Sequence, residues 1–135
     1  MSQRIYISEG EASRLRDVVD QHSEGREAAT AALLAAELDR ATVLEPERVP
    51  SDVVTIGSRV VFEEESRGQK REVVLVYPSG ANASAGRISV LAPVGAALLG
   101  LRVGDEIDWP LPGGRTAEIR ILSVDQPPLT RAEVA

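Results

Sequence analysis

A change of hydrophobic period between the two halves of the sequence limits the folds that this chain can adopt. Over residues 9–41, apolar residues recur at three- and four-residue spacing, which is typical of helices that bury one face. From Val53 onward, β-branched residues alternate with polar ones, which is typical of strands. Residues 45–51 are polar and include two prolines, so they cannot continue a helix. The sequence therefore predicts a helical unit, a linker and a strand-rich unit.

The helical unit is predicted to be an antiparallel hairpin. Ser8 followed by Glu11 is a capping-box pattern, and an apolar stripe follows it. Gly25 interrupts the pattern and can adopt a left-handed turn, and an alanine-rich helix begins near Arg26. Two helices of about 14 to 17 residues reach roughly 20–25 Å at about 1.5 Å per residue. Neither is stable alone at that length, so we expect the hairpin to rest partly on the other unit.

The strand-rich half predicts a sheet of about five strands with one short helix, an α+β arrangement. Strands are expected over residues 53–65, 71–77, 87–91, 105–109 and 115–124. A short helix is expected over residues 93–99, with proline in its first turn. The resulting division is a hairpin at 1–44, a linker at 45–52, a second domain at 53–126 and a disordered tail at 127–135.

Charge and composition exclude several classes of function. The formal net charge is −6 and no basic stripe is visible, so we expect a protein partner rather than direct contact with nucleic acid. The alternative is that the acidity only keeps the protein soluble. There is no cysteine and His22 is the single histidine, so neither a metal site nor a cofactor is predicted. No stretch approaches the roughly 20 apolar residues that span a membrane, so we expect a cytoplasmic protein. A monomer is the expected state.

A continuous run in the second half resembles the C-terminal domain of the Gre transcript-cleavage factors. Residues 88–105 read ISVLAPVGAALLGLRVGD, which is similar to the family pattern Ile-Ser-x-x-x-Pro-x-x-x-Ala-Leu-Leu-Gly-x-x-x-Gly-Asp. The upstream residues 56–60 (IGSRV) and downstream residues 112–114 (PGG) match at compatible spacing. Total length, the short hairpin and residues 52–55 (DVVT) resemble more closely the Rnk subfamily, named as regulator of nucleoside diphosphate kinase. The resemblance implies an FKBP-like C-terminal domain with a twisted antiparallel sheet.

The resemblance also implies that this domain docks at the rim of the RNA polymerase secondary channel. In Gre factors the contact is made by the loop and helix start of the Ser-x-x-x-Pro motif, which correspond here to Leu91, Ala92 and Pro93. Gre factors often place a small or acidic residue where this chain has Leu91. An apolar side chain there either packs into the core or is exposed as a docking knob, and the sequence leaves both interpretations open.

The hairpin tip is the second candidate site. Gre factors carry two tip carboxylates that help to hold a magnesium ion in the polymerase active centre, and Asp17, Asp20, Glu24 and Glu27 cluster around the predicted turn. Asp17 and Asp20 lie three residues apart on one helix face and could share an ion, although solvated acidic residues near a turn are ordinary. Gre hairpins are much longer, so this tip should stop short of the active site. The hypothesis is a regulator, not an enzyme, that competes with Gre factors without stimulating transcript cleavage.

Two other functions remain to be weighed. The FKBP-like fold suggests prolyl isomerase activity, but aromatic residues make up only 3% of the chain, too few to line that kind of pocket. The subfamily name suggests instead an adaptor or regulator that acts on a protein other than polymerase, such as nucleoside diphosphate kinase. Recovery of polymerase or of the kinase from a lysate would separate these interpretations.

Overall fold

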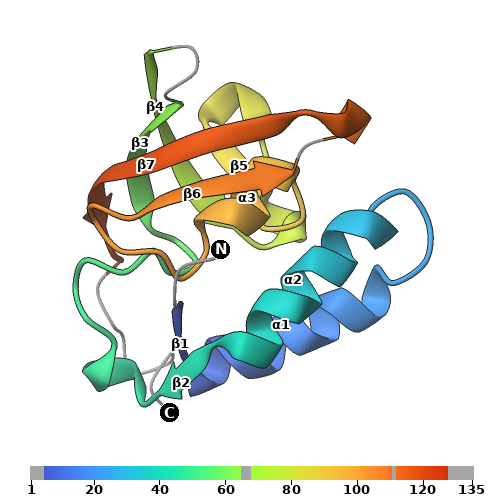
Figure 1. The fold of residues 1–135 in the computed structure, drawn as a ribbon. Coiled ribbons are helices and arrows are strands. Elements are labelled where there is room, and N and C mark those ends of the chain that lie inside the picture. Colours follow the sequence, from blue (N-terminus) through green and yellow to red (C-terminus); the bar gives the residue numbers. More distant parts are fainter. Residues whose placement is uncertain (1–4, 65–67, 111, 128–135) are drawn as a thin grey trace.

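The computed structural model describes residues 5–64, 68–110 and 112–127. A hairpin of two helices lies beside a five-stranded sheet, and a third, short helix lies between them (Figure 1). The helices are α1 (Glu9–Gln21), α2 (Ala28–Arg40) and α3 (Pro93–Leu98). The strands are β1 (Tyr6–Ser8), β2 (Thr42–Leu44), β3 (Arg59–Glu64), β4 (Gln69–Val76), β5 (Arg87–Ser89), β6 (Glu106–Pro110) and β7 (Thr116–Asp125). The predicted hairpin and five-stranded domain are confirmed.

Local sequence signals position the hairpin. The Ser8 hydroxyl accepts a hydrogen bond from the Glu11 N–H at 3.2 Å, which caps α1 and is the Ser8 half of the predicted capping box. Gly25 has a φ of +100°, a left-handed conformation that favours glycine in the turn between the helices. Each helix has 13 residues, so each is about 20 Å long at about 1.5 Å per residue.

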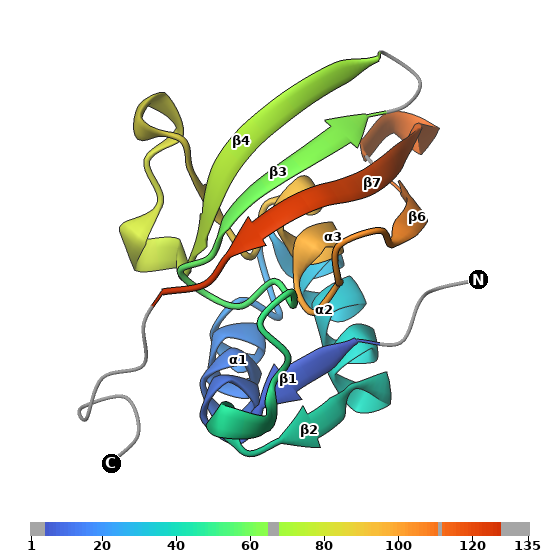
Figure 2. The same ribbon diagram turned by 90° about the vertical axis from the view of Figure 1, so that its left-hand side faces the viewer.

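Short strands at the base of the hairpin were not predicted. β1 enters α1, β2 leaves α2, and the two strands pair in parallel, with Ile7 opposite Val43 (Figure 2). The buried side chains of Ile5 and Ile7 belong to the core. A run of three residues is too short for alternation to reveal a strand, and the pairing joins segments more than thirty residues apart. The hairpin therefore has a closed base rather than two free ends.

The large sheet has the strand order β5-β4-β3-β7-β6. Three of its four pairings are antiparallel, as expected, but β4 and β5 are parallel, so the sheet is mixed. The parallel pair is possible because residues 77–86 form a connection with two short 3₁₀ turns, Pro78–Gly80 and Ala83–Ala85, that returns the chain to the start of β5. This connection was predicted only as a flexible loop.

The first strand of the large sheet begins later than predicted. Residues 53–58 were expected to be part of a strand, but Val53 makes only an isolated bridge to Arg102. The Ser58 N–H donates to the Thr55 carbonyl at 3.0 Å, and its side chain accepts from the Thr55 N–H at 2.9 Å. This turn, with Gly57 at a φ of +91°, redirects the chain into β3 at Arg59. The expected tail at 127–135 lies, apart from Pro127, outside the described residues.

One core joins the hairpin to the sheet. Buried residues of the sheet (Val60, Phe62, Val73, Leu75, Ile107, Ile119, Ile121), of residues 90–101 (Val90, Leu91, Ala96, Ala97, Leu98, Leu99, Leu101) and of the hairpin (Leu15, Ala31, Leu34, Leu38) form a single cluster. The expectation that the hairpin rests on the other unit is thus confirmed. Among the described residues, no helix has the length and apolar character needed to cross a membrane.

Candidate functional site

The turn between β5 and α3 is a fixed structure. The Ser89 hydroxyl accepts a hydrogen bond from the Leu91 N–H at 3.0 Å, and the Ser89 carbonyl accepts from the Ala92 N–H at 2.9 Å. Ala92 then has an extended backbone (φ −70°, ψ 146°) as the N-cap of α3, and Pro93 is its first residue. Proline suits this position because its φ is already close to the helical value and its missing N–H is not needed there. Residues 89–93 therefore form one constrained turn.

The structure decides between the two interpretations of Leu91. Its side chain is 1% exposed and belongs to the core cluster, so Leu91 packs inside the domain and is not a docking knob. Ala92 is partly exposed next to it. Of the three residues that the resemblance placed at the polymerase contact, Leu91 supports the turn from inside, and a contact role stays a prediction for Ala92 and Pro93.

A close helix–strand contact holds this turn in place. A Cβ atom on Gly95 would overlap the Ser89 carbonyl oxygen, so only glycine allows α3 to approach the end of β5 this closely. On the far side of α3, Gly100 has a φ of +79°, and a Cβ there would lie 2.5 Å from the Ile5 Cβ. The Gly100 carbonyl accepts from the Tyr6 N–H at 3.3 Å. These contacts connect the turn to the base of the hairpin.

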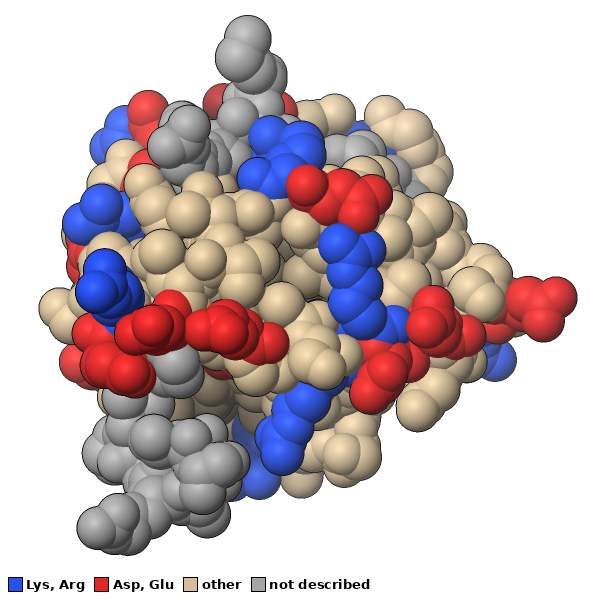
Figure 3. Space-filling model, turned by 90° about the horizontal axis from the view of Figure 1, so that it is seen from below, with Lys and Arg blue, Asp and Glu red and all other residues tan. Residues whose placement is uncertain are grey.

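The four acidic residues near the hairpin tip do not form one cluster. Asp17 and Asp20 are exposed on α1, Glu24 is exposed in the turn, and Glu27 is partly buried before α2, where its Oε1 lies 3.9 Å from the His22 Nε2. Within the described part of the chain, no group of three or more acidic, histidine or cysteine residues is arranged to hold a metal ion. Figure 3, which views the molecule from the hairpin side, shows acidic side chains spread over this face with basic ones between them.

The outer half of α1 lies beside the connection that follows β4. A groove of about 490 Å³ is lined on one side by α1 residues, including Arg14 and Gln21, and on the other by Tyr77, Pro78 and Ser79. The Arg14 guanidinium carbon lies 5.8 Å from the centre of the Tyr77 ring. The hairpin therefore runs along the sheet domain as far as the end of α1. It is not an arm that projects freely from its base.

A buried carboxyl joins α1 to the second domain. The Glu11 Oε2 accepts a hydrogen bond from the Ile56 N–H at 2.9 Å, whereas its Oε1 is buried and has no hydrogen-bond partner among the described residues. Burial raises the pKa of Glu11 from its ordinary value of 4.5 to about 7, and the hydrogen bond from Ile56 only partly opposes this effect. Burial and the nearby Glu11 charge also raise the pKa of Tyr77. The sequence indicated Glu11 only as half of a capping box.

A second link fixes the linker to the sheet domain. The Arg102 Nε donates to both carboxylate oxygens of Asp52, at 3.1 and 3.2 Å, and this pairing raises the Arg102 pKa. The Gln126 Nε2 donates to the carbonyl oxygens of Pro50 and Val53, each at 2.8 Å. Residues 45–52, predicted as a plain linker, therefore contain a 3₁₀ turn at Pro46–Arg48 and are tied to the end of β7.

These features define a class of protein with a short helical hairpin docked on a mixed-sheet domain, and comparisons with known proteins identify the same class. A structure described as a prokaryotic transcription elongation factor GreA/GreB from Nitrosomonas europaea is 44% identical and superposes with a TM-score of 0.72, covering 92% of this chain and 99% of that one. Residues 49–126 match the family "Transcription elongation factor, GreA/GreB, C-term" and residues 3–44 match "Rnk N-terminus".

Curated relatives give the same result. The "Regulator of nucleoside diphosphate kinase" of Escherichia coli K12 is 46% identical over 125 residues, which are 92% of this chain and 90% of that protein. "Transcription elongation factor GreA" of Rhizobium leguminosarum is 31% identical over 111 residues, 82% of this chain and 68% of that protein. The chain belongs to the Gre family of transcription factors, in its Rnk branch.

Proposed function

We propose that this protein binds RNA polymerase at the rim of the secondary channel and competes there with Gre factors without stimulating transcript cleavage. Family membership supports polymerase as the partner, since Gre-family factors bind RNA polymerase. The contact would be made by two residues of the 89–93 turn, Ala92 and Pro93. This function makes the protein a cytoplasmic regulator rather than an enzyme, and it acts as a monomer with no cofactor.

The observation that supports this proposal is that the hairpin is short and lies against the sheet domain. Its helices have 13 residues each, about 20 Å, and α1 lies along the sheet domain up to the groove at Tyr77. A hairpin of this length does not extend far beyond the domain that carries it. The carboxylates of Asp17 and Asp20 would therefore stay near the channel mouth instead of reaching the polymerase active centre.

Purified polymerase with a backtracked transcript tests the proposal. Addition of the protein alone should leave the RNA length unchanged, and increasing amounts should inhibit cleavage stimulated by a Gre factor. Shortened RNA that appears with this protein and disappears with Asp17→Ala and Asp20→Ala would overturn the non-cleaving role.

A pair of matched variants tests the contact surface. Ala92→Glu introduces a charge on the turn and should weaken competition at least tenfold, whereas Ala81→Glu adds the same side chain to an exposed position in the 77–86 connection and should compete normally. Circular dichroism should show that both variants are folded. Equal competition by both variants would exclude the turn as the contact.

A second candidate function rests on the name of the E. coli relative, "Regulator of nucleoside diphosphate kinase". That name suggests an adaptor that acts on the kinase directly. Co-elution of purified protein and purified kinase on gel filtration, without polymerase, would favour the adaptor. Binding to core polymerase alone would favour the first proposal.

A further inference from the structure

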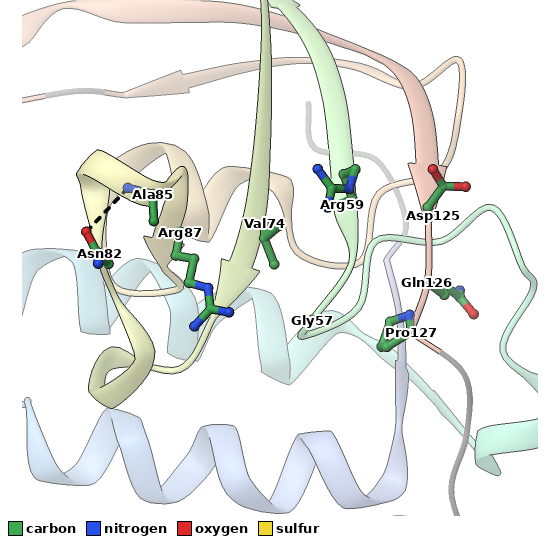
Figure 4. A pocket seen from close by; sticks show the side chains of 9 residues that line it. All are labelled: Gly57, Arg59, Val74, Asn82, Ala85, Arg87, Asp125, Gln126 and Pro127. Carbon is green, nitrogen blue, oxygen red and sulfur yellow. Dashed lines mark hydrogen bonds between the residues drawn. The ribbon is translucent and has the colours of Figure 1, made fainter.

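A polar pocket opens on the sheet at the end where β3 begins and β7 ends, and the polymerase-binding proposal does not use it. The pocket has a volume of about 670 Å³, which is in the range of sites for small molecules. Arg59, Val74 and Arg87 line it from three strands, and Figure 4 shows the two arginines on either side of Val74, with Asp125 next to Arg59 on the far side from Val74.

Strand register places the two arginines in one row. Arg59 on β3 is opposite Val74 on β4, and Val74 is opposite Arg87 on β5. Residues directly opposite each other share a face of the sheet, and neighbouring strands are about 4.8 Å apart. The two arginines therefore start about 10 Å apart on the same face, with one aliphatic side chain between them. Both side chains are long enough to converge on a ligand above Val74.

Arg87 supplies a positive charge at one side of the pocket. Its backbone is fixed by two hydrogen bonds with Asn82, each 3.0 Å long, and by its place in the pairing with β4. Among the described residues, Arg87 forms no ion pair, whereas Arg59 donates to the Glu72 Oε2 at 2.7 Å. Arg87 is therefore the stronger candidate for a ligand contact, because the Arg59 guanidinium is already paired with the Glu72 carboxylate.

The rest of the lining is preorganised and leaves the pocket open. The Asn82 Oδ1 accepts from the Ser84 hydroxyl at 2.8 Å and from the Ala85 N–H at 3.3 Å, so the amino end of this carboxamide is the end left to donate. Gly57 has a φ of +91°, and a Cβ there would lie 3.0 Å from the Pro127 Cγ. A side chain at position 57 would therefore reduce the space in the pocket next to Pro127.

We propose that the pocket binds a small ligand with two oxyanion groups, phosphate or carboxylate, held by Arg87 and Arg59 with the Asn82 amide as a further donor. Guanidinium groups match such oxygens with paired hydrogen bonds. Two arginines whose backbones are about 10 Å apart suit a ligand with two anionic groups better than a ligand with one. Asp125, which is opposite Arg59 in the register of β3 and β7, limits the affinity because it repels an anion.

Titration of the full-length protein at constant ionic strength, followed by amide chemical shifts, tests this site. Pyrophosphate, inorganic phosphate and succinate serve as probes. We expect saturable shifts in residues 82–87 with pyrophosphate or succinate, each of which has two anionic groups, at lower concentration than with inorganic phosphate. Saturation by pyrophosphate alone assigns phosphate groups, and saturation by succinate alone assigns carboxylates. If neither pyrophosphate nor succinate causes saturable shifts, the proposed site is refuted.

Four variants distinguish anion binding in this pocket from non-specific electrostatic attraction of anions to the protein. Arg87→Gln should raise the Kd at least tenfold, Arg59→Gln should raise it less, and Asp125→Asn should lower it. Arg115→Gln is the matched control, because Arg115 precedes β7 whereas Asp125 ends it, about 30 Å away at about 3.3 Å per residue. An unchanged Kd for Arg87→Gln, or an equal loss for Arg115→Gln, would refute the proposal.

Discussion

Replacement of Glu11 by glutamine should stabilise the protein at neutral pH and should change its dependence on pH. The carboxyl is buried between α1 and the turn before β3, and its pKa is raised to about 7 in the folded protein from an ordinary value of 4.5. The folded state therefore retains this proton between about pH 4.5 and 7, whereas the unfolded state releases it. Stability contributed by the neutral carboxyl is fully present below pH 4.5 and is lost as the pH rises toward 7.

The difference of about 2.5 pKa units corresponds to about 3 kcal/mol of unfolding free energy at about 1.36 kcal/mol per unit. Glutamine keeps an oxygen that can accept from the Ile56 N–H and carries no charge at any pH. We therefore expect Glu11→Gln to match the wild type near pH 4 and to exceed it by up to about 3 kcal/mol near pH 8.

Urea unfolding followed by far-ultraviolet circular dichroism, at intervals from pH 4 to pH 8, measures this difference. Glu9→Gln is the matched control, because Glu9 is exposed in the same first turn and its replacement should change stability by only a few tenths of a kcal/mol. A Glu11→Gln variant less stable than the wild type at pH 8, or a difference that does not change with pH, would refute the argument from burial.

Four further substitutions test the packing around the turn and the hairpin. Gly95→Ala should cost at least about 2 kcal/mol in thermal or urea unfolding because its Cβ overlaps the Ser89 carbonyl, whereas Gly10→Ala, with open space around it in α1, should gain up to about 1 kcal/mol. Ser8→Ala should cost about 1 kcal/mol through loss of the helix cap, measured in the same way. Leu91→Ala should lower the free energy of unfolding by about 2–5 kcal/mol because Leu91 is buried. The folded fraction of this variant should compete with a Gre factor for polymerase at the same midpoint concentration as the wild type. A shifted midpoint would show that Leu91 contacts polymerase directly.

Much of the fold could be predicted because its signals are local. The cap at Ser8, the left-handed turn at Gly25 and the proline at the start of α3 each act within one turn of chain, and the structure has each where the sequence indicated it. The parallel pairing of β1 with β2, and of β4 with β5, depends on contacts between distant segments, which alternation within a segment cannot reveal.

The candidate site shows the same division between local and distant information. A motif resemblance located residues 91–93, but only the packed structure shows that Leu91 faces the core while Ala92 is partly exposed. The Glu11 contact with Ile56 joins residues 45 positions apart, and the arginine row depends on the exact register of three strands. No sequence spacing encodes either arrangement, because both depend on how distant segments pack in the folded protein.

The packing of the hairpin against the sheet domain also determines whether the hairpin could extend further by separating from the sheet. Leu15, Leu34 and Leu38 are buried in the same core as α3 and the sheet, and full exposure of each such side chain costs about 1.5–3 kcal/mol. Undocking would also add no length to helices of 13 residues. A docked hairpin is therefore the stable state, and it supports the proposal of a factor that occupies the channel mouth rather than the polymerase active centre.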